Sequence, residues 1–183
     1  MNDLQGMPTA REVVDFWREA GPAKWFNGGT AFDDALRERF EAAHFAAARR
    51  ELEGWMDDAE GALALLVLLD QVPRNLFRGS AHSYATDPLA LHYAGRMLEG
   101  GLDREVEPAL RVFCYLPFEH SEDLLDQERS VALMADLGET YADYAVQHFD
   151  VIERFGRFPH RNRALGRASS ADEQAWLDAG GGF

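Results

Sequence analysis

The sequence predicts an all-α fold: a single domain, residues 1–183, of seven or eight helices packed as antiparallel hairpins. Two capping boxes, Thr9–Glu12 and Ser170–Glu173, each place a hydroxyl three residues before an acid, which is typical of a helix start. The run ALALLVLL at residues 62–69 is apolar on every side, as in a helix at the centre of a protein. No run alternates apolar and polar residues between turn signals, so we predict no strand.

Three helices are expected in the first part of the chain. The first spans residues 10–20 and stops at Gly21-Pro22. The second spans residues 30–52, with its first residue, a threonine, as the cap. The third begins after an aspartate cap, over residues 58–72, and is expected to end at Pro73 because a residue before proline avoids the helical conformation.

Five further helices follow from cap and stop signals. A threonine cap and a proline in the first turn predict a helix over residues 86–99, closed by two glycines. Another is expected over residues 107–117, between two prolines, and a serine cap predicts the next over 121–138. Residues 139–155 are expected to form a helix that ends at Gly156, and the second capping box begins a short last helix over 170–179.

Charge and composition exclude several classes of protein. The chain has 32 acidic residues against 18 Lys and Arg, and its net charge of -14 repels nucleic acid and anionic membranes, so we expect neither as a partner. The start of the chain lacks a basic stretch followed by an apolar one, and the longest apolar run is far below the ~20 residues that cross a bilayer, so we expect a cytoplasmic protein. The single cysteine, Cys114, excludes an internal disulfide; it is either a small buried hydrophobe or a thiolate near Arg111.

Positive charge is concentrated in one segment of this acidic chain. Residues 154–167, RFGRFPHRNRALGR, contain five arginines and a histidine but no acid. We call them the arginine segment. Guanidinium groups bind carboxylates and phosphates in a bidentate geometry. The segment is therefore either a latch that binds acids at helix ends or part of an anion site, and both can hold together. The acids expected at helix ends are Asp70, Glu119, Glu122 and Asp123.

Two polar side chains interrupt apolar helix faces. Asp70 follows the most apolar run of the chain, and a buried carboxylate needs a partner, either Arg74 at i+4 or an arginine of the arginine segment. His148 is either a core histidine that one partner satisfies or the wall of a polar cavity. On a helical wheel it shares its face with Tyr141, Tyr144, Ala145, Ile152 and Phe155.

Common catalytic motifs are missing from the sequence. It has no glycine-rich phosphate loop, no Gly-x-Ser-x-Gly and no His-Glu-x-x-His, and it lacks the two Glu-x-x-His motifs that a di-iron bundle requires. His120, Glu122, His148 and His160 lack the regular spacing of metal ligands, so we expect no metal and no cofactor. Whether the protein is an enzyme stays open at this level.

Three stretches carry a resemblance to a known family: LLDQVPRNLFRG at 68–79, LPFEHSEDLLDQ at 116–127, and HFDVIERFGRFPHRNRALGR at 148–167. They resemble the bacterial family called domain of unknown function 924, over nearly the whole chain. The chain departs from the family pattern at Phe118, where Met is usual, and at Ser170, where Thr is usual. The resemblance implies an all-α fold of tetratricopeptide-like helical hairpins and implies no reaction.

The polar positions of the family's motifs are those that the residue analysis selects, together with Ser121. We predict that they converge in space. The candidate site consists of Asp70, Gln71, Arg74, Asn75, Arg78, His120, Glu122, Gln127, His148, Arg157, His160, Arg161 and Asn162.

Three functions are compatible with this cluster. In the first, a small anionic ligand, a carboxylate or phosphate ester, is held by arginines, with His148 or His120 handling a proton. The four arginines expected to hold it are Arg74, Arg78, Arg157 and Arg161. In the second, the cluster is structural and the hairpins bind a peptide through exposed aromatics such as Trp25 or Trp176. The third, RNA binding by the arginine segment, is opposed by the net charge. The sequence does not specify the oligomeric state.

Overall fold

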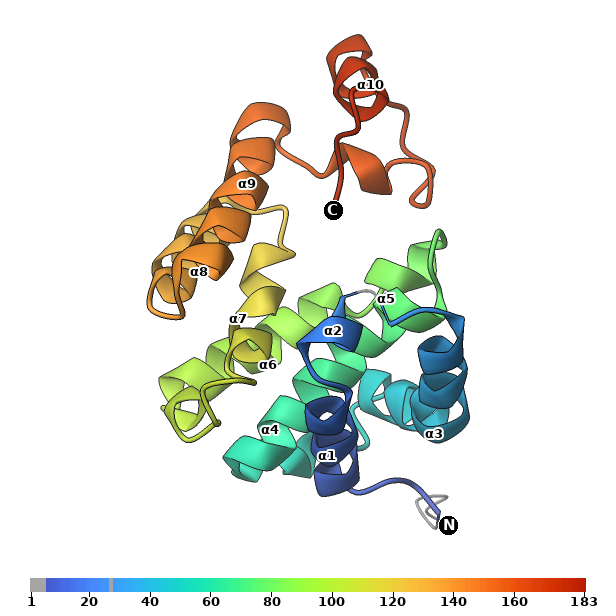
Figure 1. The fold of residues 1–183 in the computed structure, drawn as a ribbon, viewed down its shortest axis with the longest axis vertical. Coiled ribbons are helices and arrows are strands. Elements are labelled where there is room, and N and C mark those ends of the chain that lie inside the picture. The colour runs from blue at the N-terminus through green and yellow to red at the C-terminus, as the bar shows by residue number, and fades with distance from the viewer. Residues whose placement is uncertain (1–5, 27) are drawn as a thin grey trace.

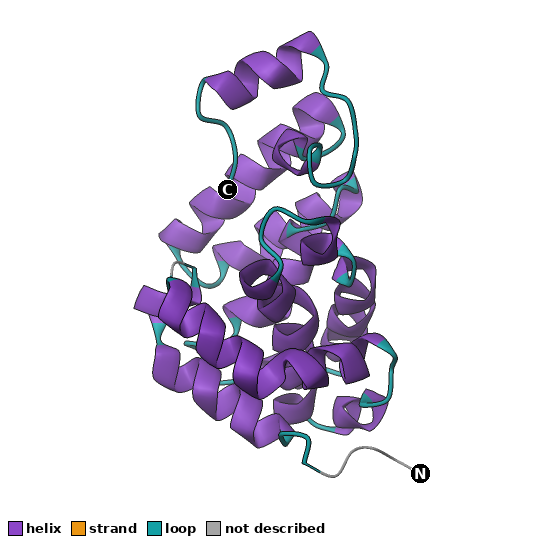
Figure 2. Cartoon of the chain, turned by 90° about the vertical axis from the view of Figure 1, so that its right-hand side faces the viewer, coloured by secondary structure: helices purple, strands orange, loops and turns teal. Residues whose placement is uncertain are grey.

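The computed structural model describes residues 6–26 and 28–183, and within these residues it is all-α without strands (Figures 1 and 2). The predicted fold class is confirmed. No helix in this part of the chain has both the length and the apolar character needed to cross a membrane. The helices are α1 (Ala10–Ala20), α2 (Pro22–Trp25), α3 (Thr30–Ala48), α4 (Ala59–Leu66), α5 (Val72–Leu76), α6 (Asp87–Glu99), α7 (Val112–Glu119), α8 (Leu124–Ala135), α9 (Glu139–Phe155) and α10 (Ala171–Asp178).

Short helical turns connect several of these helices. The π-helical turn η2 (Val67–Gln71) joins α4 to α5, and the 3-10 turn η5 (Pro159–Arg161) follows α9. The other 3-10 turns are η1 (Glu53–Asp57), η3 (Ala81–Tyr84) and η4 (Leu102–Arg104).

The strongest local signals give the predicted helix ends. In both capping boxes the hydroxyl accepts the backbone N–H of the glutamate, and the glutamate side chain accepts the backbone N–H of the cap. Helix α9 has the predicted bounds and ends at Gly156, whose φ of 68° lies in the left-handed region that favours glycine.

Two predicted helix ends are wrong, and one predicted cap makes a different hydrogen bond. Helix α3 stops at Ala48, four residues early, since Arg50 adopts a left-handed φ of 63°. Thr86 is the residue before α6, as predicted, but its hydroxyl donates to the carbonyl of Leu69 and makes no capping hydrogen bond. Asp123 caps α8 in place of the expected serine, with its carboxylate accepting two backbone N–H groups.

Two prolines lie within helical segments that they were expected to end. Pro73 falls in the first turn of α5, where a missing N–H costs no hydrogen bond, and the π turn before it directs the N–H of Val72 to the carbonyl of Val67. Pro117 lies inside α7, whose eight residues are all buried, so tertiary packing maintains the helix. Consequently α7 runs over 112–119 in place of the expected 107–117.

Helix α4 lies at the centre of the protein, as predicted. Every residue of the apolar run 62–69 is buried, and α4 packs against α1, α6 and α7. Cys114 is fully buried in the same core, and burial raises the pKa of its thiol, so it acts as a small hydrophobe. Trp25 is buried as well, with its indole N–H donating to the carbonyl of Trp17, which contradicts its expected role as an exposed anchor.

The end of the chain forms a separate layer, which we call the C-terminal segment (residues 156–183). In Figure 1 α10 stands at the top, beyond the end of α9 and away from α1–α5. Helix α10 packs on η5, and a second, small apolar cluster supports it. This cluster contains Val151, Ile152 and Phe158, with Phe155 and Trp176 packed against them.

Candidate functional site

The π turn η2 positions the most buried charge of the site. Asp70 lies in this turn and is 1% exposed. Its carboxylate accepts hydrogen bonds from Gln71 Nε2 at 2.6 Å and His120 Nδ1 at 2.7 Å, and Arg74 Nη1 lies at 3.2 Å. Burial alone raises the pKa of Asp70, but the charges of Arg74 and His120 and these hydrogen bonds bring it below its ordinary value. Asp70 is therefore an ion held on three sides.

Asp87, at the start of α6, binds two arginines from distant parts of the chain. Arg74 donates to both of its carboxylate oxygens, at 2.8 and 2.9 Å. Arg161 of the arginine segment donates to the same carboxylate at 3.3 Å. We call the cluster of Asp70, Arg74, Asp87, His120 and Arg161 the polar junction. Acidic residues are favoured at this position by the partial positive charge of the helix N-terminus.

Arg161 has more hydrogen-bonding capacity than its partners use. Its guanidinium carbon lies 4.7 Å from the ring centre of Tyr84 and 4.4 Å from that of Phe158, so two aromatic rings sandwich it. The residue is 6% exposed, and its Nε has no partner among the described residues. Burial and the charge of Arg74 lower the pKa of Arg161 to about 10. A buried guanidinium with an unused N–H donor is a candidate group for binding an anion.

His120 lies in the turn between α7 and α8. Because an ionised carboxylate can only accept, the Nδ1–H of His120 points to Asp70 and its Nε2 carries the lone pair. Burial and Arg74 lower the pKa of His120. Gln127 fixes the turn, because its Nε2 donates to the carbonyls of Glu119 at 2.6 Å and Ser121 at 2.7 Å. The arrangement gives a neutral imidazole positioned to accept a proton.

Glu119 and His148 form a second buried pair beside the polar junction. Glu119 Oε1 lies 3.6 Å from His148 Nδ1, which donates to the carbonyl of Tyr144 at 2.8 Å. Burial and the charge of Asp70 raise the pKa of Glu119 to about 8, so this carboxyl is protonated at neutral pH. Burial lowers the pKa of His148 to about 3, so the imidazole is neutral. The site thus contains an acid and two neutral bases whose pKa values are displaced in opposite directions.

Two arginines of the arginine segment, Arg161 and Arg167, bind acids at helix starts and so act as a latch. Arg167 donates to both oxygens of Glu122, at 2.7 and 2.9 Å, and Glu122 also accepts the backbone N–H of Phe158 at 2.8 Å. Arg161 binds Asp87, and not Asp70 as one prediction allowed. Arg157 pairs with Glu173 inside the C-terminal segment, at 2.6 and 2.8 Å. The segment therefore connects α6 and the start of α8 to the end of the chain.

Five of the thirteen predicted site residues do not present a side chain to the polar junction. Arg78 is half exposed and binds Asp33. Arg157 pairs with Glu173 in the C-terminal segment. The other three support backbone or neighbouring side chains: Asn75 (donating to the carbonyl of Gln71), Gln127 (bracing the turn at His120) and Asn162 (donating to Ser169).

The rest of the predicted set does converge. Gln71, Arg74, His120 and Arg161 surround the two aspartates, while His148, His160 and Glu122 lie at the edge. His160 is mostly buried, its Nδ1 has no partner in the described part of the chain, and burial and Arg161 lower its pKa to about 4. On the shared face predicted for His148, Ala145 and Ile152 are buried, but Tyr144 is 53% exposed.

Asp87, Tyr84 and a histidine pair were missed by the sequence analysis. Asp87 binds both Arg74 and Arg161. In the sequence it is an acid at a helix start, and nothing there indicates a distant partner. His44 is fully buried on α3; its Nδ1 donates to the carbonyl of Leu68 at 2.8 Å, and its Nε2 accepts from His82 at 2.9 Å. Its place four residues after Phe40, on the apolar face of α3, is the signal that could have identified it.

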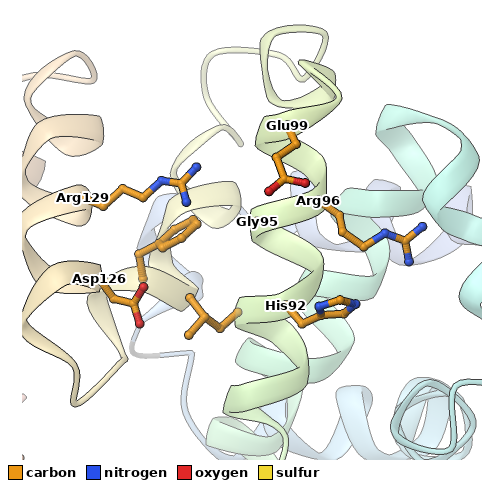
Figure 3. Close-up of a pocket in the computed structure, with 8 residues that line it drawn as sticks. His92, Gly95, Arg96, Glu99, Asp126 and Arg129 are labelled. Carbon is orange, nitrogen blue, oxygen red and sulfur yellow. The ribbon is translucent and has the colours of Figure 1, made fainter.

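Two open pockets lie away from the polar junction. One, of about 280 Å³, opens between α6 and α8, with Glu99 and Arg129 facing each other across it (Figure 3). The other, of about 450 Å³, lies beside Arg154 and Arg157 at the base of α10. The junction itself is more closed, since the side chains of Arg74, Asp87 and His120 are only 19, 14 and 13% exposed.

Comparison with known proteins gives a family and a solved relative. The model of a bacterial family of unknown function, DUF924, matches residues 13–181. The structure of a protein of unknown function from Agrobacterium tumefaciens is 53% identical, covers 93% of this chain and 97% of that chain, and superposes with a TM-score of 0.91. No curated protein matches the chain.

Proposed function

The chain belongs to the bacterial DUF924 family, and we propose that it binds a small anionic ligand, a carboxylate or a phosphate ester, at the polar junction. The observation that carries the proposal is the unused hydrogen-bonding capacity of Arg161. A guanidinium presents its donors in a planar fork that fits the two oxygens of such an anion. Burial strengthens that interaction because the local dielectric is low.

The surrounding charges support an anion more than a cation. The pKa of Arg161 is lowered by burial and by Arg74, so an anion bound in addition to Asp70 and Asp87 would relieve the remaining repulsion between the two arginines. The three histidines near them, His120, His148 and His160, have lowered pKa values and add no further positive charge at neutral pH. No group of three or more His, Cys, Asp or Glu in residues 6–26 and 28–183 is arranged to hold a metal ion.

His120 would supply proton chemistry to a bound anion. Its Nδ1–H is held by Asp70, which leaves Nε2 free to accept a proton from the ligand. The residue before it, Glu119, carries a protonated carboxyl group at neutral pH. An acid and a base whose environments displace their pKa values in opposite directions are typical of sites that transfer protons.

The peptide-binding alternative has less support. Trp25 is buried, and Trp176 packs against Phe155. Exposed apolar side chains do occur along α8 and α9, at Leu125 and Tyr144. The unpartnered Nε of Arg161 in the polar junction favours the anion.

Binding of inorganic phosphate and acetate tests the proposal, by calorimetry and by the shift in the unfolding midpoint. Wild-type protein should bind at least one of them, and Arg161→Lys should weaken that binding by about tenfold, because lysine keeps the charge but loses the planar fork. Arg96→Lys is the matched control, since Arg96 pairs with Glu53 on the surface. Failure of wild-type protein to bind either anion, or equal binding by Arg161→Lys, would contradict the proposal.

Arg161→Met separates the latch from the ligand site. Breaking the buried pair with Asp87 should reduce the free energy of unfolding by about 2 to 4 kcal/mol. If Arg161 were a latch alone, this loss would appear without any response of the wild-type protein to anions. Both effects together are expected, because the same guanidinium would hold the segment and the ligand.

A further inference from the structure

An aromatic ring already lies beside the polar junction. The ring of Phe183 stacks face to face on His148 of α9, with centroids 3.6 Å apart and planes 15° from parallel. It meets Phe158 and His160 edge to face, at centroid distances of 6.2 and 5.8 Å and angles of 89° and 82°. We call the space bounded by His148, Phe158 and His160 the aromatic slot.

The walls of the aromatic slot are fixed independently of Phe183. His148 is held by the hydrogen bond from its Nδ1 to the carbonyl of Tyr144, and Phe158 is fully buried. The centroids of these two rings are 5.7 Å apart and their planes meet at 76°. A ring inserted between them can therefore stack parallel to His148 and lie perpendicular to Phe158. Parallel and edge-to-face contacts are the two arrangements that aromatic pairs prefer.

Phe183 is held loosely compared with these walls. It is 52% exposed, whereas His148 and Phe158 are buried. Three glycines precede it, and Gly182 has a φ of 139°, a conformation that other residues rarely adopt. A β-carbon at Gly182 would lie 3.4 Å from the β-carbon of His160, so the chain passes close to the slot without a side chain in the way. A ligand could displace this ring at small cost.

Unused polar atoms lie next to the aromatic slot. His160 Nδ1 is buried without a partner in the described residues, and the unpartnered Nε of Arg161 belongs to the next residue. The guanidinium of Arg161 lies against Phe158, which is also a wall of the slot. A flat ring in the slot with an acid group on a short arm would therefore bring that group toward His160 and Arg161.

We propose that the aromatic slot binds the planar ring of an aromatic anion, such as an aryl carboxylate, and that Phe183 occupies the slot until the ligand displaces it. This inference rests on the proposed function, because Arg161 would hold the acid group. To the proposed function it adds the chemical class of the ligand, an aromatic acid, and a side chain of the protein, Phe183, that competes with this ligand. The apparent affinity for a ligand equals the intrinsic affinity multiplied by the fraction of molecules in which the slot is free.

Three probes test the ligand class: phenylacetate, cyclohexylacetate and acetate. Cyclohexylacetate has nearly the same size and charge as phenylacetate but no flat π face. Phe183→Ala should bind phenylacetate about 3- to 10-fold more tightly than wild-type protein does, because the ring of Phe183 no longer competes with the ligand for the stacking contact with His148. Acetate should bind both proteins equally, and cyclohexylacetate should bind Phe183→Ala at least about threefold more weakly than phenylacetate.

Two further variants control the experiment. Phe26→Ala removes a phenylalanine of similar exposure, 57%, that does not contact the slot, and should leave all affinities unchanged. His148→Leu should abolish the preference for phenylacetate over cyclohexylacetate while acetate still binds. Unfolding midpoints of all variants show whether each protein is folded.

The outcomes separate this inference from the proposed function. If acetate or phosphate binds through Arg161 but phenylacetate gains nothing from Phe183→Ala, the aromatic slot is wrong and the anion site stands. If cyclohexylacetate binds as tightly as phenylacetate, the slot selects size and the aromatic class is wrong. If no probe binds any protein, both proposals are overturned.

Discussion

The helical body (α1–α9) and the C-terminal segment are held by different forces. The body encloses one large apolar core that buries α4 from Gly61 onward. The C-terminal segment packs on the end of α9 through a small apolar cluster, and the ion pairs Arg161–Asp87 and Arg167–Glu122 tie it to the rest of the body. Apolar burial is non-directional and insensitive to pH, whereas ion pairs respond to pH, salt and competing ions. The candidate site lies at the seam, where a charged ligand can alter the contacts that hold the segment.

The largest effect is expected from a cavity in the body. Leu68 is fully buried in η2, and Leu68→Ala should lower the free energy of unfolding by about 2 to 5 kcal/mol, through lost burial and the cavity left behind. Urea denaturation followed by circular dichroism measures this loss. A change below about 1 kcal/mol would show that the core at α4 is not the main source of stability.

A pH-dependent effect is expected at the seam itself. The pKa of Glu119 is raised from 4.5 to about 8 by burial, so its stabilising contribution is full below pH 4.5 and is lost as the pH rises through 8. Glu119→Gln mimics the protonated form. It should match wild-type protein at pH 4 and be more stable by about 3 kcal/mol at pH 7, which lies about 2.5 pH units above the ordinary pKa, at 1.36 kcal/mol per unit.

The histidines of the seam give this prediction an internal check. The pKa values of His148 and His160 are lowered to about 3 and about 4. Their contribution to the stability of the folded protein is therefore full above pH 6.5 and is lost as the pH falls toward those values. Stability should therefore decrease on both the acid and the alkaline side. If Glu119→Gln showed the same alkaline loss as wild-type protein, Glu119 would not be the group responsible.

A smaller and more local effect is expected in the C-terminal segment. Glu122→Gln removes the charge that binds Arg167 and should cost about 1 to 3 kcal/mol, between surface and fully buried pairs, since Glu122 is 28% exposed. Hydrogen exchange should accelerate in residues 156–183 and remain unchanged in α4. This result would show that the segment opens without the body.

Glu53→Gln is the matched control for that variant and the smallest expected effect. Glu53 also pairs with arginines, Arg50 and Arg96, but on an exposed surface. Its loss should change the free energy of unfolding far less than Glu122→Gln does, because solvent screens exposed ion pairs. An equal cost for Glu53→Gln and Glu122→Gln would contradict the distinction between latch and surface pairs.

The predicted helices were right where the signal is local. Capping boxes and the glycine after Phe155 gave correct ends, because hydroxyls, carboxylates and backbone groups three or four residues apart meet in any helix. The predicted stop at Pro117 was wrong because the packing of a buried helix outweighs the local preference. The helix start at Thr86 was right, but its hydroxyl binds a distant carbonyl in place of the helix N-terminus. Eight of the thirteen predicted site residues reach the polar junction or its edge, since polar groups on apolar helices must find partners.

The sequence by itself determined the all-α fold, the central position of the apolar helix and the types of polar residue that gather at the seam. Apolar periodicity and caps are properties of neighbouring residues. Only the tertiary structure decided which arginine meets which acid, and that Phe183 stacks on His148. Arg161 and Asp87 are 74 positions apart, and Arg167 and Glu122 are 45 apart. Any guanidinium suits any carboxylate chemically, so the choice depends on how the helices pack.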